Sequence, residues 1–446
     1  MKIFFLFIPL FLVHNVHSQG PVLCFSDLIS GPKTGNSDHS QENQTAGRDG
    51  SIVTIWGANL GNHQNNNEVF VGNQKARVYY WGNATFPADL YKVHKLQKIA
   101  FQIPETVDTG NTEISVIVNG IKSNSLPFRV REGKIYFVDK MGDDVAGDGS
   151  WDKPWKTLDN ADYTGALEKI KPGDLLYVKD GFVHTELVGD RSCFDIGNPG
   201  TRELPKAIIA YPQANVQIGD TSTLKTFSLW VSGYGPSTNW VISGLKLTAK
   251  TEAVSMYHNF RVVGNYITAP NGNGPTGAVA GQGNDLYLLG NELTEIGNLN
   301  TSKLYHPIYI QSAEACSGPR LPLEKNRVIA FNYLHDNLSY DGINLYRECG
   351  SSAYMTDHKV FNNAIINQTG CGIRCGDYVV GENHIYNNLL VNCGLGPDPI
   401  NGYAMHVPMH IHAGWDDTIS LIHCYNNTIV GGDFGMDRNG LLQWLV

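Results

Sequence analysis

The feature that most constrains the fold is a short motif that recurs through the second half of the chain. The motif reads apolar-x-x-Asn-x-apolar, and its Asn residues are Asn265, Asn291, Asn332, Asn363, Asn388 and Asn427. The steps between these residues are 26, 41, 31, 25 and 39 residues long. Steps that share a minimum but vary in length predict the coils of one solenoid, with loops inserted into some of them.

A column of Asn residues has a physical use in a solenoid. A side-chain amide inside a turn can hydrogen-bond the equivalent amide of the next coil, as in stacked Asn ladders. Asn also tolerates the left-handed backbone that such a turn needs. The alternative is an ordinary antiparallel sandwich with Asn turns, but six copies of the motif in one frame favour the solenoid.

The stretch before the repeat carries a second pattern. Gly and Asp cluster over 142–150, Lys-Pro-Trp follows at 153–155, a helix is predicted over 161–169, and Lys-Pro-Gly-Asp opens an apolar strand at 171–178. With the repeat, this series resembles the right-handed parallel β-helix of the pectate-lyase-like superfamily over residues 132–446. The resemblance implies a solenoid with a helix capping its first coil. It leaves the reaction open, because lyases, hydrolases, epimerases and adhesins share this fold.

Short alternating strands divided by Gly and Asn turns lie between residues 51 and 130 and predict a β-sandwich. Several short runs here resemble the IPT/TIG type of immunoglobulin-like domain over residues 48–131: Val53-Thr54-Ile55-x-Gly57, Val71-Gly72, Ile103-Pro104 and Asn119-Gly120. The resemblance implies a spacer or binding module. Residues 19–47 are rich in Gly, Ser, Asn and Asp and predict a linker or a loosely held entry segment. The predicted fold class is all-β, an immunoglobulin-like β-sandwich followed by a right-handed parallel β-helix solenoid.

The first residues predict export. Lys2 precedes an apolar run over 3–13, and small residues follow, which indicates a signal peptide over residues 1–18. The run is too short to span a bilayer. We therefore expect a protein secreted to an extracellular or periplasmic space, with no membrane association after cleavage. Residues 440–446 either cap the solenoid or mark a fragment whose later coils are missing.

The cysteine count bears on disulfide bonding, and the net charge bears on the class of partner that the protein binds. Eight cysteines in an exported chain favour disulfide bonds. Cys316 and Cys349 form a candidate pair, whereas Cys375 and Cys424 fall at core positions and suit small apolar roles. A net charge of −9 argues against a nucleic-acid partner. It is compatible with an acidic polysaccharide bound by a local cluster of Arg and His. We expect a monomer.

Each coil carries a strand that precedes the strands around the Asn motif, and these strands hold the best site candidates. Aligned with one another, they cover 307–311, 342–346, 372–376 and 408–412. Because strand side chains alternate between faces, one face is apolar and the other carries a polar row of Tyr309, Asn344, Arg374 and His410. A neighbouring column carries Gln311, Tyr346 and His412, and His306 and Asp341 lie just before their strands.

The residue types in the polar row suit β-elimination on a uronate sugar. A cation must neutralise the carboxylate, a base must remove the adjacent proton, and an acid can protonate the leaving oxygen. Arg374 suits carboxylate binding, His410 suits the base, and Tyr309 or His306 could supply the acid. We assign substrate binding to Asn344, Tyr346, Gln311, His412 and Asp341.

Four alternatives remain at this stage. In some β-helix lyases an Arg is the base beside Ca²⁺, which would need carboxylates such as Asp341 and Asp377. Glycoside hydrolysis could use the same two carboxyl groups, with Glu348 behind them. His406, His410 and His412 could bind zinc or copper. A non-catalytic adhesin or glycan-binding protein would present an ordinary solvated polar face, although Lys and Glu are absent from these four strands.

Overall fold

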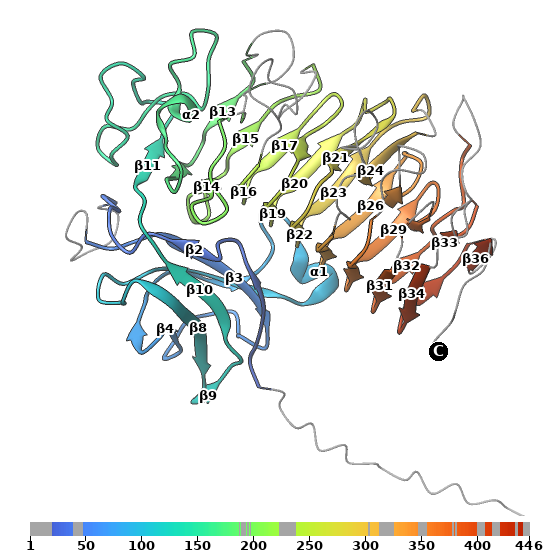
Figure 1. Cartoon of the computed structure of the whole chain (residues 1–446), viewed down its shortest axis with the longest axis horizontal. Helices are drawn as coiled ribbons and strands as arrows, with labels where there is room; N and C mark the ends of the chain where they lie inside the picture. The colour runs from blue at the N-terminus through green and yellow to red at the C-terminus, as the bar shows by residue number, and fades with distance from the viewer. Residues whose placement is uncertain are drawn as a thin grey trace, which may run out of the picture.

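The chain is all-β, as predicted, and forms a β-sandwich followed by a parallel β-helix (Figure 1). This computed structural model describes residues 20–38, 48–186, 188, 193, 196, 198–222, 238–301, 304–311, 325–346, 355–376, 379, 381–398, 406–412, 420–432 and 436–439. The predicted signal peptide and residues 440–446 lie outside this part of the chain. No helix within the described residues is long and apolar enough to cross a bilayer.

Two sheets form the sandwich. One has the order β1 (Val22–Ser26), β3 (Ile52–Ala58), β7 (Gln97–Gln102) and β6 (Arg77–Asn83). The other has the order β2 (Ser30–Gly31), β10 (Leu126–Val130), β8 (Gly110–Val118), β4 (Glu68–Val71) and β5 (Gln74–Lys75), with β9 (Ile121–Lys122) on β8. A short helix, α1 (Leu90–His94), connects β6 to β7 and is capped by the side chain of Asp89.

The segment predicted as a linker contributes two of these strands. β1 pairs antiparallel with β3, and β2 pairs parallel with β10. Leu23 and Phe25 of β1 are buried. Their five-residue strand sits in a Gly- and Ser-rich stretch, and this composition hid the alternation that buries every second side chain. The linker prediction is therefore wrong for the described residues of this segment.

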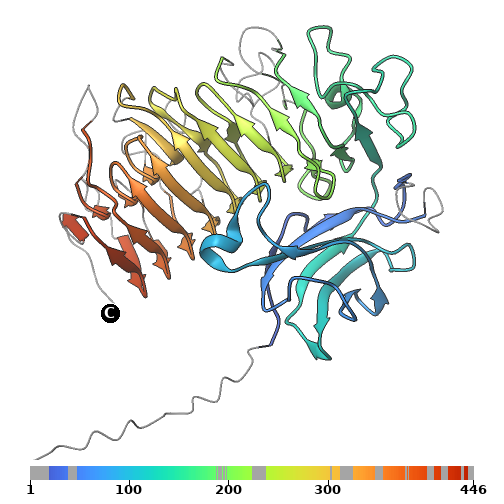
Figure 2. The same cartoon turned by 180° about the vertical axis from the view of Figure 1, so that it is seen from behind.

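Three parallel sheets form the solenoid (Figure 2). The first sheet contains β11 (Ile135–Val138), β12 (Leu175–Val178), β14 (Lys206–Ala210), β16 (Trp240–Ser243), β19 (Phe260–Val263), β22 (Leu286–Leu289), β25 (Arg327–Ala330), β28 (His358–Phe361), β31 (Gly381–Tyr386) and β34 (Ser420–Tyr425). The second contains β13 (Val183–His184), β15 (Gln217–Ile218), β17 (Lys246–Thr248), β20 (Tyr266–Ala269), β23 (Glu292–Ile296), β26 (Tyr333–Asn337), β29 (Ala364–Gln368), β32 (Leu389–Val391) and β35 (Thr428–Val430). The third contains β18 (Val254–Met256), β21 (Thr276–Gly281), β24 (Tyr305–Gln311), β27 (Ile343–Tyr346), β30 (Ile373–Cys375), β33 (Met409–His412) and β36 (Met436–Asn439).

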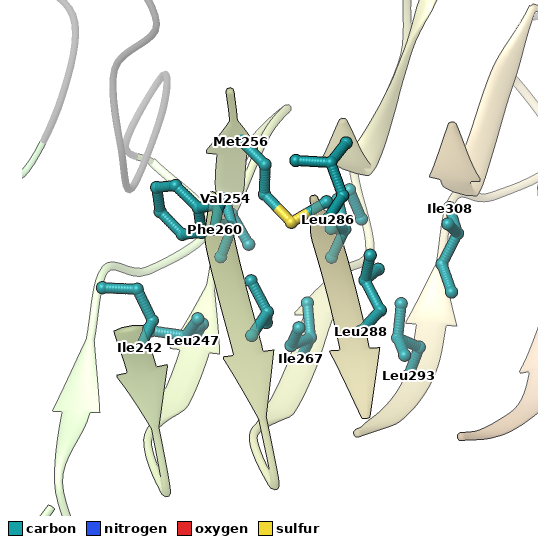
Figure 3. Close-up of a cluster of buried hydrophobic side chains, with 14 of the residues drawn as sticks. Ile242, Leu247, Val254, Met256, Phe260, Ile267, Leu286, Leu288, Leu293 and Ile308 are labelled. Carbon is teal, nitrogen blue, oxygen red and sulfur yellow. The ribbon is translucent and has the colours of Figure 1, made fainter. Parts of the chain in front are cut away.

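The solenoid encloses one continuous apolar core. Side chains from all three sheets meet inside the coils, and Figure 3 shows Ile242, Leu247, Met256 and Ile308 among them. Near the start of the solenoid, the predicted helix is shorter than expected and is a single turn, α2 (Ala166–Lys169). Its buried Ala166 and Leu167 belong to the same core.

The Asn ladder predicted from the repeat is present at the turn between the first and second sheets. Each Nδ2 donates to the Oδ1 of the next Asn, over 3.0, 3.0, 2.9, 2.9 and 2.9 Å from Asn265 through to Asn427. Each Oδ1 also accepts a backbone N–H from the preceding coil, beginning with that of Leu245. The ladder therefore satisfies buried backbone and side-chain groups together.

The left-handed position lies one residue earlier than the motif suggested. The residues that precede the ladder have φ values from 52° to 66°, and they are Gly264, Gly290, Phe331, Asn362, Asn387 and Asn426. A Cβ on Gly264 would lie 2.6 Å from Trp56 of the sandwich, and one on Gly290 would lie 2.5 Å from Phe25. Glycine is thus needed at these two turns for the backbone and for the close approach of the sandwich.

The sandwich packs on the outer face of the first sheet and shares apolar clusters with it. One cluster joins the sandwich core to Phe137, Tyr177 and Val241 of the solenoid. A second joins Phe25, Trp56, Leu90, Val263 and Leu289, together with further side chains. Figures 1 and 2 show α1 lying against the solenoid strands.

The described cysteines form no disulfide bond. Cys24, Cys193, Cys371, Cys375, Cys393 and Cys424 are all free thiols. Cys375 is buried in the solenoid core and Cys424 packs against it, which is the small apolar role predicted for both. The candidate pair Cys316 and Cys349 lies outside the described residues.

Candidate functional site

The third sheet aligns the polar row as the sequence predicts. Tyr309 pairs with Asn344, Asn344 with Arg374, and Arg374 with His410, on β24, β27, β30 and β33. In the neighbouring column Gln311 pairs with Tyr346. The parallel register therefore places side chains from four successive coils next to one another, about 4.8 Å apart.

The polar row is largely buried, whereas the sequence predicts that it lies on an outward, solvent-facing side of the sheet. Tyr309, Asn344 and His410 are 4%, 3% and 4% exposed, and His306 and Asp341 are 3% and 0% exposed. Aromatic rings in this cluster pack against one another. The His306 ring stacks on Tyr309 at 5.1 Å and lies 5.7 Å from Tyr340. Strand alternation predicts which face of the sheet a side chain points to. It does not predict whether neighbouring side chains then cover it.

Arg374, Tyr346 and Gln311 form the accessible edge of this site. All three side chains are half-buried, and 19% of the Arg374 side chain is exposed. The Arg374 guanidinium lies 5.5 Å from the centre of the Tyr346 ring, within the range of a cation–π contact. This edge therefore presents a cation beside an aromatic ring, a combination that suits an anionic sugar.

A buried carboxyl group lies behind Arg374. Asp341 Oδ2 is 3.7 Å from Arg374 Nη1 and 3.8 Å from His306 Nδ1. Burial raises the pKa of Asp341 to about 7, against the opposing effect of the Arg374 charge. Asp341 thus changes its protonation state near neutral pH, and with it the net charge beside Arg374.

His306 is a neutral group in the same cluster. Its Nδ1 lies 3.3 Å from the carbonyl oxygen of Asp341, and its Nε2 lies 3.1 Å from Nδ2 of Asn344. The backbone N of Asp341 also lies 3.2 Å from Nδ1. With the proton on Nδ1, Nδ1–H donates to the carbonyl and Nε2 accepts from the amide; without it, Nδ1 accepts from the Asp341 N–H. Burial and the nearby Arg374 charge lower the pKa of His306 to about 3. A neutral imidazole is a poor proton donor, so His306 does not suit the role of the acid.

Four further residues were named from the sequence as possible site residues, and the structure describes the side chain of one of them, His406. Asp377 and Glu348 lie outside the described residues, as does the side chain of His412. His406 is engaged elsewhere, with Nε2 at 2.9 Å from Asp398 and Nδ1 at 3.0 Å from the carbonyl of Gly394.

The described donors do not fit Ca²⁺. That ion takes six to eight oxygen ligands. Among the described residues of this cluster, Asp341 is the carboxylate, and the Arg374 cation lies beside it. We therefore derive no step through calcium.

Two features of the solenoid were not predicted from the sequence. Tyr340, at the turn before Asp341, packs on His306. On the outer face of the first sheet, Glu382, His384 and His423 come together. The repeat holds a signal for the second feature, because His384 and His423 each precede the apolar residue that opens the motif in their coils.

The comparisons with known proteins concern the sandwich and the fold. Residues 39–130 match the IPT/TIG domain family, which confirms the resemblance of the sandwich. No curated protein matches the chain. The chain is similar to the crystal structure of a GH136 lacto-N-biosidase from Eubacterium ramulus, with 13% identity and a TM-score of 0.30 over 70% of this chain and 67% of that one.

Proposed function

We propose that this protein is a secreted polysaccharide lyase of the pectate-lyase-like type, which cleaves a uronate-containing acidic polysaccharide on the third sheet. The observation that supports the proposal is the partly exposed Arg374 beside the buried carboxyl of Asp341. Arg binds carboxylates through two parallel N–H donors. Below about pH 7 Asp341 is neutral, so the Arg374 charge faces the substrate carboxylate without an internal competitor.

The reaction needs three groups around one sugar. Arg374 holds the carboxylate, which makes the adjacent C–H acidic. His410, paired with Arg374 in the register, takes that proton as the base. The C–O bond of the glycosidic link then breaks as the C=C bond forms, and a water molecule gives a proton to the leaving oxygen, because Tyr309 lies three strands from His410, roughly 14 Å away. Because His410 is 4% exposed, substrate binding must uncover it.

Glycoside hydrolysis is the second candidate, and one observation favours it. A buried carboxyl group with a pKa raised to about 7, such as Asp341, is typical of a general acid in glycosidases. Hydrolysis requires a second carboxyl group across the sugar, and the predicted partner Asp377 lies outside the described residues.

Product chemistry separates these candidates. The protein is incubated with alginate, pectate, chondroitin, hyaluronan and glucuronan, while the ultraviolet absorbance of unsaturated sugars and the number of reducing ends are recorded together. A lyase raises both signals on one polymer. New reducing ends without a rise in absorbance would show that the reaction is hydrolysis and not elimination. No change in either signal on any of these polymers would contradict the proposal.

Matched variants assign the residues. We expect Arg374→Ala and His410→Ala to lower the rate at least about 100-fold, the scale of one acid–base or electrostatic contribution. Arg129 is an exposed arginine on β10 of the sandwich. Arg129→Ala should leave the rate unchanged, and a loss in this control would point to a general effect on the fold.

A further inference from the structure

A second cluster of ligating side chains lies on the outer face of the first sheet. Glu382 and His384 are two residues apart on β31, so their side chains share a face, and His423 pairs with His384 on β34. Glu382 Oε1 lies 3.3 Å from His384 Nε2 and 3.5 Å from His423 Nε2. One ligand atom from each residue lies within 4.8 Å of the others.

These separations suit a small transition-metal ion. Metal–nitrogen and metal–oxygen bonds to zinc are about 2.0–2.2 Å long, so two ligands at a tetrahedral angle lie roughly 3.3–3.5 Å apart. Both Glu–His distances fall in that range. The imidazole rings are stacked, with centroids 4.6 Å and planes 10° apart, so the two rings must rotate toward each other for both Nε2 atoms to bind one ion.

The partial burial of the cluster favours a metal-binding site and not an ordinary solvent-exposed group of polar residues. His423 Nε2 is buried and forms no hydrogen bond, although 14% of the side chain is exposed. A buried polar atom without a hydrogen bond is costly, and a metal bound between His423 and Glu382 would satisfy it. Glu382 is 66% exposed, so the cluster opens to solvent on one side and an ion can enter.

We propose that Glu382, His384 and His423 bind one divalent transition-metal ion of the zinc class. Two imidazoles and one carboxylate select zinc, copper or nickel over calcium and magnesium. Three protein ligands leave a fourth position for water. The ion would link β31 to β34 and so stabilise the last two coils described in the first sheet. This site is independent of the proposed lyase activity.

Metal titration of the untagged full chain tests the proposal. Calorimetry with ZnCl₂ and metal analysis after dialysis should give one ion per chain, and the thermal midpoint should rise with zinc but not with CaCl₂. We expect Glu382→Gln to weaken zinc binding by about tenfold or more and His384→Ala with His423→Ala to abolish it. Because Glu382 is largely exposed, Glu382→Gln keeps the test valid even where the double variant fails to fold.

His63, an exposed histidine of the sandwich, supplies the control. His63→Ala should bind zinc as the unmodified chain does. Absence of zinc binding by the unmodified chain, or unchanged binding by Glu382→Gln and the double variant, would overturn the proposal.

Discussion

At the scale of residues, the solenoid depends on a few buried polar groups with fixed partners. Asn332 lies in the middle of the Asn ladder and is fully buried. It donates to the Leu288 carbonyl and to Asn363, and it accepts from the backbone and the side chain of Asn291. Replacing it leaves several of these groups without partners in a dry interior, where each costs about 1–3 kcal/mol.

We therefore expect Asn332→Leu to lower the free energy of unfolding by about 3 kcal/mol or more, measured by urea denaturation. Asn427→Leu is the matched control. Asn427 is half-buried at the end of the described ladder, so water can replace its contacts, and we expect a loss of about 1 kcal/mol. Equal effects at both positions would contradict a ladder whose interior amides are the critical ones.

Asp341 makes stability depend on pH in a defined direction. Its pKa is raised to about 7 in the folded protein, against about 3.9 in an unfolded chain. The folded state therefore prefers the protonated carboxyl, and stability falls as pH rises from about 4 to about 7. The full shift corresponds to about 4 kcal/mol, as an order of magnitude.

We expect Asp341→Asn to be more stable than the unmodified chain at about pH 8 and to show no such gain at about pH 4. Denaturation curves across this range provide the measurement. Asp108→Asn, at an exposed position of the sandwich, should show no pH-dependent difference. A constant difference between Asp341→Asn and the unmodified chain at all pH values would contradict the raised pKa.

At the scale of elements, parallel register brings distant residues together. The sequence pattern was sufficient to align four strands of the third sheet and the Asn turns, because strand alternation and the repeat are local signals. It could not show that the polar row is buried, since His306 packs on the Tyr309 ring of its own strand and on the Tyr340 ring of the next coil. It also missed β1, whose partner β3 begins 26 residues after its last residue.

The contact between β12 and the sandwich is another non-local element. The hydroxyl of Tyr177 donates to the Ile52 carbonyl and accepts from the Ile52 N–H, both at 2.8 Å. We expect Tyr177→Phe to cost about 1–3 kcal/mol, because both backbone groups of Ile52 are left buried without this partner. Hydrogen exchange should show lost protection in β3 as well as in β12. Tyr163→Phe, at an exposed tyrosine, serves as control, and loss confined to β12 would contradict the coupling.

At the scale of the whole molecule, the sandwich and the solenoid divide the surface between them. The sandwich covers much of the outer face of the first sheet through two shared clusters. No described residue of the third sheet belongs to either cluster, so the candidate site lies away from the sandwich. Family resemblance predicted both modules from sequence. The shared interface was not predictable, because its contacts join residues far apart in the sequence. Arg261, for example, donates to the carbonyls of Ser26 and Asp27.

The central claim is that Arg374 binds the carboxylate of an acidic glycan. The most direct measurement is calorimetric binding of an oligouronate to His410→Ala, chosen to prevent turnover, with and without Arg374→Ala. The account predicts that removal of Arg374 weakens binding at least about tenfold, or about 1.4 kcal/mol, and that the neutral methyl ester binds as weakly. Equal affinity with and without Arg374, or equal affinity for the acid and its ester, would contradict it.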